Sequence, residues 1–231
     1  YGSISTTLGT AGSMQLGGFS PAISNGGAVS LTNTAQILTY GALSDAIKIQ
    51  SIGGGGGTST LRDEFSGSPL AGGSLLLGTG VGGGSGGTVD LTLKSPSSIL
   101  TVESLSLGVL AQSIGGGGGD ARLGALSILG LKGGFSSNLG ASSTASAGHG
   151  SSVTITSNSS ITTAAQGSDA IVAQSIGGGG GFGALYGIGK SAPVFATALS
   201  GTSGTSAAGV MSEINIPSTS SSAYAGIAQN N

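Results

Sequence analysis

The sequence predicts an all-β fold, a repetitive parallel β-solenoid (β-helix) built from glycine-rich repeats of about 62 residues. The segment SIGGGGG begins at Ser51, Ser113 and Ser175, so the spacing is constant. A fixed period of this length is typical of proteins that stack structural repeats. Before each segment apolar residues alternate with polar ones, as in half-buried strands, and helical periodicity is nowhere sustained. Regular spacing and a period of two therefore both favour stacked strands.

The repeats divide the chain into one elongated repeat domain with a partial unit at each end. The expected units are 1–57, 58–119, 120–181 and 182–231. Tyr1 and the following glycine resemble the pair at Tyr186, so the chain begins within a repeat, and Asn230 and Asn231 replace the expected Ser-Ile. We infer a piece of a longer array, or a subunit whose ends meet those of its neighbours.

Three short strands are expected at equivalent places in each complete repeat. They are residues 29–31, 37–40 and 46–52, then 89–93, 99–102 and 109–114, then 153–155, 161–163 and 170–176. Asn, Pro and Gly, which favour turns, separate them. Three strands in some 25 residues is the spacing of one solenoid coil. The apolar but poorly patterned stretches that remain, 123–131 and 182–188, are expected to form further coils or a lateral sheet.

The composition disfavours a conventional globular enzyme. Only 6% of the residues are charged, against about a quarter in an ordinary domain, 4% are aromatic and 49 are glycine. Disorder is also disfavoured, because 37% of the residues are hydrophobic and disordered chains are poor in apolar residues and rich in charge. The net charge of −2 gives no electrostatic reason to expect nucleic acid or acidic lipid as a partner.

Targeting and redox signals are sparse. No apolar run reaches the roughly 18 residues of a transmembrane helix, and the first residues lack the basic start and apolar centre of a signal peptide. The chain has no cysteine and therefore no disulfide framework.

The glycine runs admit two interpretations. In a stacked coil, glycine lets neighbouring backbones approach closely or lets a turn take a positive φ. Alternatively, each run is a mobile loop that projects from the coil. On the first interpretation the structural and assembly residues are Gly53, Gly57, Gly115, Gly119, Gly177 and Gly181, with Tyr1, Asn230 and Asn231 at the ends.

Repeated tracts such as VTITSNSSITT and GSDAIVAQSIGGGGG, joined by glycine-rich spacers, resemble the passenger regions of large bacterial autotransporter proteins of type V secretion. The resemblance spans nearly the whole chain, although Ile49-Gln50 replaces the alanine-glutamine pair in the first copy. It implies a parallel β-helical passenger on the bacterial cell surface, exported through an outer-membrane barrel.

Catalytic motifs are matched only in part. Residues 83–87 (GGSGG) fit the nucleophile-elbow pattern, but the only histidine, His149, is expected to be a solvated loop residue. The segment ending at Lys190-Ser191 fails as a phosphate-binding loop, because Ala184 stands where its first glycine belongs. We expect no catalytic residue and no cofactor.

Carboxylates are too few for a clear metal site. Asp45 and Asp169 are expected to cap turns rather than to hold calcium. Residues 115–120 fit the letters of a calcium-binding nonapeptide, but Arg122 stands where a large apolar residue is needed. The charges of residues 62–64 and of Asp120 with Arg122 directly follow glycine runs and are expected at solvated corners.

The sequence thus favours a non-enzymatic, extracellular structural or adhesive protein, either a cell-surface passenger or a filament subunit that assembles head to tail or binds a host or abiotic surface. The alternative is a carbohydrate-binding or carbohydrate-processing β-helix that uses Asp63, Glu64 and exposed Tyr40 or Tyr186. A weaker third hypothesis, an ice- or surface-binding solenoid, rests on rows of Ser and Thr.

Overall fold

The chain folds into stacked parallel β-sheets. The computed structural model describes residues 12–16, 24–63, 73–77, 83–125, 135–139, 148–186, 195–199, 212–215 and 225–228. These residues form strands and connections without a helix, which confirms the prediction of an all-β fold. No helix in this part of the chain has the length and apolar character needed to cross a bilayer.

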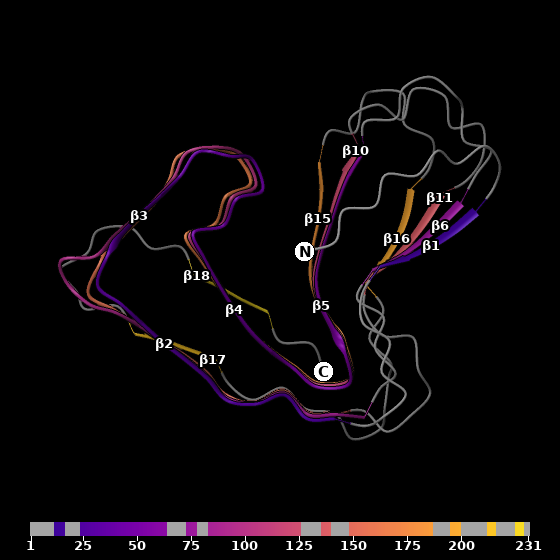
Figure 1. Ribbon diagram of the computed structural model, residues 1–231, viewed down its shortest axis with the longest axis horizontal. Coiled ribbons are helices and arrows are strands. Elements are labelled where there is room, and N and C mark those ends of the chain that lie inside the picture. Colours follow the sequence, from indigo (N-terminus) through magenta and orange to yellow (C-terminus); the bar gives the residue numbers. More distant parts are fainter. Residues whose placement is uncertain are drawn as a thin grey trace.

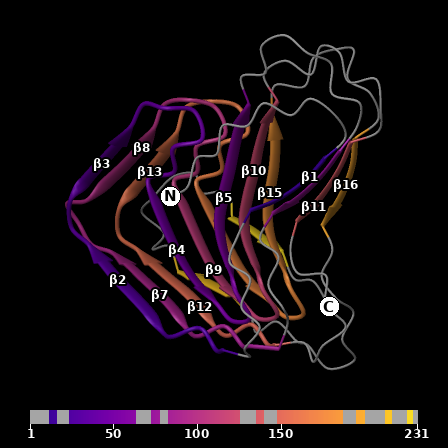
Figure 2. The same ribbon diagram turned by 45° about the vertical axis from the view of Figure 1, so that its right-hand side comes forward.

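Within these ranges eighteen strands form five sheets, and every pairing is parallel (Figures 1 and 2). The first two sheets contain β17 (Ser212–Asn215), β12 (Val153–Ser157), β7 (Val89–Leu93) and β2 (Val29–Asn33), and β13 (Ser160–Thr163), β8 (Ser98–Thr101) and β3 (Gln36–Thr39). The third contains β18 (Ala225–Ala228), β14 (Ile171–Ile176), β9 (Val109–Ile114) and β4 (Ile47–Ile52). The last two contain β15 (Gly180–Tyr186), β10 (Gly118–Ala125) and β5 (Gly56–Asp63), and β1 (Gly12–Leu16), β6 (Gly73–Leu77), β11 (Phe135–Leu139) and β16 (Phe195–Leu199).

Each strand pairs with its equivalent in the next repeat. Ser51 pairs with Ser113 and Ser113 with Ser175, so the period of the sequence is the register of the sheet. The three strands expected in each repeat lie close to the predicted positions, as β2, β3 and β4 and their equivalents. The prediction that they complete a coil of their own is wrong, because a strand meets its equivalent only one whole repeat later.

The glycine-rich remainder of each repeat supplies two further strands. β5 and β6 follow the first glycine run, and β10 and β11 follow the second. One unit therefore consists of five strands: the first unit is β2 to β6, the second β7 to β11 and the third β12 to β16. Figure 1 looks down the shortest axis of the molecule, and the strands of each sheet largely overlap in that view. Each unit adds only about 4.8 Å along the stack, so the chain is broad across the stack and short along it.

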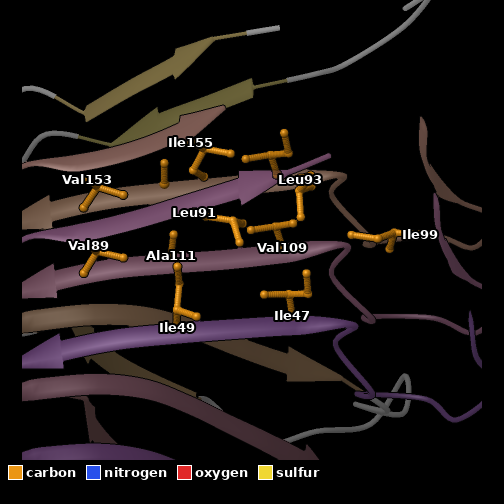
Figure 3. Close-up of a cluster of buried hydrophobic side chains, with 12 residues drawn as sticks. Ile47, Ile49, Val89, Leu91, Leu93, Ile99, Val109, Ala111, Val153 and Ile155 are labelled. Atoms are coloured by element: carbon orange, nitrogen blue, oxygen red, sulfur yellow. The ribbon is translucent and has the colours of Figure 1, made fainter. Parts of the chain in front are cut away.

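The apolar core lies between the sheets that contain β2, β3 and β4 (Figure 3). Its side chains come from the inward row of each strand, and those on β7, β8 and β9 are more completely buried than those on β2, β3 and β4. They include Val89, Leu91, Leu93, Ile99 and Val109, each at most 1% exposed. Because equivalent residues stack in register, Leu91 of β7 lies between Leu31 of β2 and Ile155 of β12.

We expect Leu91→Ala to lower the free energy of unfolding by about 2–5 kcal/mol, because it leaves a cavity in the middle of this column. Leu31→Ala is the matched control, since Leu31 is 37% exposed at the end of the same column. Its cost is expected to be less than half as large. Denaturant titration followed by circular dichroism measures both, and equal costs would contradict the burial described for the column.

Candidate functional site

The recurrent QSIGGGGG segments lie where β4, β9 and β14 end and the chain turns into β5, β10 and β15. Their glutamines form a ladder that runs from unit to unit. Gln50 Nε2 donates to Gln112 Oε1 at 2.6 Å, and Gln112 Nε2 donates to Gln174 Oε1 at 2.5 Å. Gln112 is fully buried, and a buried amide is tolerated only when it is hydrogen-bonded. The ladder satisfies this requirement with copies of the same residue.

The serine that follows each glutamine joins neighbouring units. Ser113 Oγ donates to Gly87 O and accepts a hydrogen bond from the Ser151 backbone N, both at 2.8 Å. Ser51 Oγ makes the same pair of bonds one unit earlier, to Gly27 O at 2.7 Å and from Gly87 N at 2.8 Å. Each hydroxyl thus fixes the segment before β2, or its equivalent, in two successive units.

The glycine runs form an ordered corner. Gly117 N donates to Gly53 O at 2.8 Å and Gly179 N to Gly115 O at 2.7 Å, so the runs are bonded directly to one another. On the other side, Gly116 N donates to Gly84 O at 2.9 Å. Of the two interpretations left open by the sequence, the described structure shows close packing rather than a projecting loop.

The corner needs glycine for two physical reasons. In the second run φ rises from 81° at Gly116 to 137° at Gly119, a region that L side chains rarely adopt. A Cβ on Gly118 would overlap the carbonyl oxygen of Gly180. Positive φ and close approach of backbones therefore act together.

The structure places six of the nine predicted structural residues. Gly53, Gly115 and Gly177 begin the bend, whereas Gly57, Gly119 and Gly181 lie in β5, β10 and β15 and pair with one another in register. Tyr1, Asn230 and Asn231 lie outside the described residues. Their predicted part in assembly stays a prediction.

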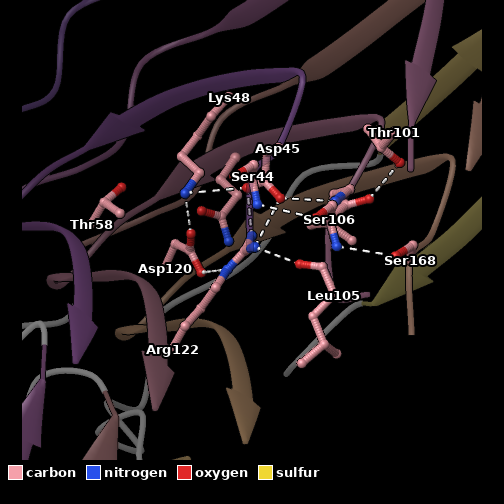
Figure 4. A network of polar contacts seen from close by, with 12 residues as sticks. Ser44, Asp45, Lys48, Thr58, Thr101, Leu105, Ser106, Asp120, Arg122 and Ser168 are labelled. Carbon is pink, nitrogen blue, oxygen red and sulfur yellow. Dashed lines mark hydrogen bonds and ion pairs between the residues drawn. The ribbon is translucent and has the colours of Figure 1, made fainter. Parts of the chain in front are cut away.

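Asp120 and Arg122 do not form a solvated corner, and that prediction is wrong. Each is only 1% exposed, between the sheet of β4, β9 and β14 and the sheet of β5, β10 and β15. There they meet Asp45 and Lys48 of the first unit, which gives a buried cluster of two positive and two negative charges (Figure 4). We call these four residues the charge cluster.

Arg122 is the centre of the charge cluster. Its Nη1 and Nη2 donate to the two carboxylate oxygens of Asp45 at 2.8 and 2.5 Å, and its Nε donates to Asp120 Oδ1 at 2.9 Å. Nη1 also donates to Leu105 O at 3.1 Å, and the guanidinium lies 5.2 Å from the ring centroid of Phe182. Such bidentate, planar recognition of a carboxylate is particular to arginine.

Lys48 completes the charge balance. Its Nζ lies 3.2 Å from Asp45 Oδ2 and donates to Asp120 Oδ2. Its side chain is 26% exposed, whereas those of Asp45 and Asp120 are 4% and 0% exposed. The cluster therefore reaches solvent only through the lysine.

The electrostatic balance keeps Arg122 charged. Burial removes water from the guanidinium and lowers its pKa, but the hydrogen bond to Asp45 and the charges of Asp120 and Asp45 outweigh this and raise the pKa above its ordinary value. A raised pKa gives stability that is fully present below the unfolded-state value and is lost only as pH rises through the folded-state value. The arginine is therefore charged throughout the physiological range.

Sequence spacing gave no signal for the charge cluster. Arg122 and Asp45 are 77 residues apart, and Lys48 and Asp120 are 72 apart, so neither separation matches the repeat period. The contacts cross between two sheets instead of following one. One step further along the stack, apolar Leu107 and Leu110 of the second unit pack with Val172 and Phe182 of the third and occupy the equivalent space.

The other candidates named from the sequence do not gather into one site. Asp169 and His149 are exposed, and Tyr40 is 70% exposed. Ser85 Oγ accepts a hydrogen bond from the backbone N of His149 at 3.2 Å, so this contact involves the main chain of His149 and not its imidazole. Asp45 Oδ1 accepts a hydrogen bond at 2.8 Å from the backbone N of Leu107, 62 residues away in the next unit, and Asp45 also binds Arg122, so its expected role as the cap of its own turn stays a prediction.

Several candidates lie where little or nothing is described. Asp63 and Tyr186 end β5 and β15, where only the backbone is described, and Glu64, Lys190 and Ser191 lie outside the described residues. Within the described ranges no three His, Cys, Asp or Glu side chains come together as a metal site. Comparisons with protein families, with curated proteins and with solved structures find no match for this chain.

We expect Gly118→Ala to lower the free energy of unfolding by at least about 2 kcal/mol, because it combines an unfavourable φ with a backbone overlap. Gly27→Ala is the matched control, since a Cβ there meets nothing within 4 Å. Thermal and denaturant unfolding compare the two variants. Equal costs would show that the corner is not packed as described.

Asp45→Asn is expected to lower the free energy of unfolding by about 3–5 kcal/mol, because it leaves Arg122 with less compensation in a buried place. Asp90→Asn, at an exposed position on β7, should change it by about 0.5 kcal/mol or less. In a double-mutant cycle with Arg122→Met, the combined cost should fall below the sum of the single costs. Additive costs would mean that the two side chains do not interact.

Proposed function

We propose that the chain is a parallel β-solenoid that serves as an extracellular structural or adhesive scaffold, as a bacterial cell-surface passenger or a filament subunit. One observation carries the proposal. The residues of the recurrent motif are used to bond one unit to the next, through the glutamine ladder, the serine bridges and the glycine corner. Because the motif residues bond successive units to one another, they support a structural role for the repeats.

The hydroxyl side chains on the outer surface are compatible with a scaffold that contacts water or another surface. The outward rows of β2, β7 and β12 carry hydroxyl side chains at exposed or half-exposed positions. They are Ser30, Thr32, Thr92, Thr154 and Thr156. The resemblance to autotransporter passengers supports an extracellular place for such a surface.

The few charged groups also favour a structural function over carbohydrate processing. Glycoside hydrolysis needs two carboxyl groups that flank a bound sugar. Asp45 and Asp120 are buried and bonded to Arg122 and Lys48, so they act in holding the sheets together. Among the side chains that the structure describes, Tyr40 is the one exposed aromatic, so they supply no aromatic platform for a sugar.

Hydrogen exchange tests the scaffold itself. If the glycine corner is a repeated structural element, the amides of Gly117 and Gly179 should exchange as slowly as those of β9, because each is bonded to the preceding unit. Rapid exchange at the corner beside a protected β9 would contradict the solenoid. The measurement is made on the whole chain by mass spectrometry at neutral pH.

A glycan array and a polysaccharide hydrolysis screen distinguish a structural scaffold from a carbohydrate-binding or carbohydrate-processing protein. A purely structural protein should show neither saturable glycan binding nor product. Saturable binding that is lost in Tyr40→Ala, or any hydrolysis, would favour the carbohydrate-active alternative. Leu38→Ala, which alters a neighbouring exposed side chain of β3, is the control for binding.

A further inference from the structure

The contact between Lys48 and Asp120 brings an amine and a carboxyl group together between two sheets. Lys48 is on β4 of the first unit and Asp120 is on β10 of the second. Lys48 Nζ donates to Asp120 Oδ2 (Figure 4). The side chain of Asp120 is fully buried, and that of Lys48 is only partly exposed. Two groups that can condense to an amide are therefore in direct contact and largely shielded from water.

A second carboxylate contacts the same amine. Asp45 Oδ2 lies 3.2 Å from Lys48 Nζ, and the Asp45 side chain is buried. An amine attacks a carboxyl carbon only after it has lost a proton, so it needs a base within hydrogen-bond reach. Asp45 supplies that base. Its carboxylate is held against the amine by both terminal nitrogens of Arg122 and by the backbone N of Leu107.

Arg122 is placed to stabilise charge on Asp120 during such an attack. Its Nε donates to Asp120 Oδ1 at 2.9 Å, whereas Lys48 contacts Oδ2. Negative charge develops on the carboxyl oxygens when a nitrogen adds to Asp120 Cγ, and a fixed donor at such an oxygen lowers the barrier. The two oxygens thus have different partners, with the charge-stabilising donor at Oδ1 and the amine at Oδ2.

The charge balance of the cluster also favours condensation. Removing two charges from water costs free energy that their mutual attraction repays only with excellent geometry. Loss of the charges of Lys48 and Asp120 together would leave the bidentate pair of Arg122 with Asp45, which is balanced by itself. Well-oriented groups held in one site reach effective concentrations on the order of 10⁵–10⁸ M, which opposes hydrolysis of the amide.

We propose that Lys48 and Asp120 condense to an intramolecular isopeptide crosslink between β4 and β10, with Asp45 as the catalytic base. Asp45 takes a proton from the ammonium group, and the free amine attacks Asp120 Cγ to form the new C–N bond. The nitrogen gives up two protons in all, which Asp45 passes to Oδ2. The bond from Cγ to Oδ2 then breaks, one water leaves and Asp45 is again a carboxylate. The reaction consumes no oxidant or other reactant.

This crosslink goes beyond the proposed scaffold function and does not rest on it. It closes a loop between residues 72 apart in a chain that has no cysteine. Like a disulfide, it would stabilise the fold mainly by restricting the unfolded chain. It would also join covalently two sheets that the charge cluster otherwise holds by ion pairs.

The mass of the intact chain tests the crosslink directly. We expect the folded wild-type chain to be lighter than its sequence by one water molecule. Lys48→Arg keeps the positive charge but presents a guanidinium that stays protonated, so this variant should have its full mass. Lys94→Arg, which makes the same change at an exposed position after β7, is the matched control and should lose water as the wild type does. Hydrogen exchange in β9 reports whether each variant keeps its fold.

Tryptic digestion places the bond. Trypsin cleaves after Lys and Arg but not after an acylated Lys48. Residues 1–62 should therefore remain one peptide, and this peptide should be joined to residues 95–122. Fragmentation of the joined peptides is expected to assign the bond to Lys48 and Asp120.

A time course after refolding from urea tests the base. Asp45→Asn keeps both reacting groups, and a folded Asp45→Asn chain should lose water at least about 100-fold more slowly than the wild type. An unchanged rate in that folded variant would overturn the role of Asp45.

The wild-type mass alone decides the crosslink. The crosslink is overturned if the folded wild-type chain keeps its full mass through prolonged incubation at neutral pH. It is also overturned if the lost water maps to other residues or is still lost in Lys48→Arg. A chain of full mass with protected glycine corners would leave the scaffold function in place.

Discussion

The structure depends on one constraint, that each repeat lies a single strand spacing from the next with its residues in register. Every side chain then has its own equivalent about 4.8 Å away on either side. A column is stable only if its residue tolerates a copy of itself at that distance. Glutamine and serine can bond to copies or to adjacent backbone, aliphatic residues pack, and glycine leaves room for neighbouring carbonyl groups.

Charged residues do not satisfy this constraint when they repeat, because like charges directly opposite each other in a sheet repel. The register shows how the chain avoids the problem. Lys48 is followed in its column by Leu110, and Asp120 lies between Thr58 and Phe182. Arg122 likewise has Thr60 on one side and Ala184 on the other. Stacking in register therefore disfavours repeated charges, and the four charges of the charge cluster find partners across sheets.

The charge cluster therefore joins two sheets between which no backbone hydrogen bond is found in the described part of the chain. A buried ion pair seldom adds more stability than apolar residues of the same volume, but its geometry is specific. Asp45 and Lys48 belong to the first unit, and Asp120 and Arg122 to the second. The cluster consequently fixes how the two sheets face each other at one level of the stack, while apolar side chains fill the same space at the next level.

The sequence by itself determined the all-β class, the 62-residue register of β4, β9 and β14, and the positions of β2, β3 and β4 with their equivalents. The spacing of the SIGGGGG segments and the alternation of apolar residues predict these features, because the first pattern is strictly periodic and the second is local. It could not determine that one unit needs five strands, since the glycine-rich strands β5 and β6 show no clear alternation. Only the tertiary structure decided that the glycine runs bend into a packed corner and that Asp120 and Arg122 are buried. The reason is that those outcomes depend on which sheet lies opposite which, and no interval along the chain encodes that arrangement.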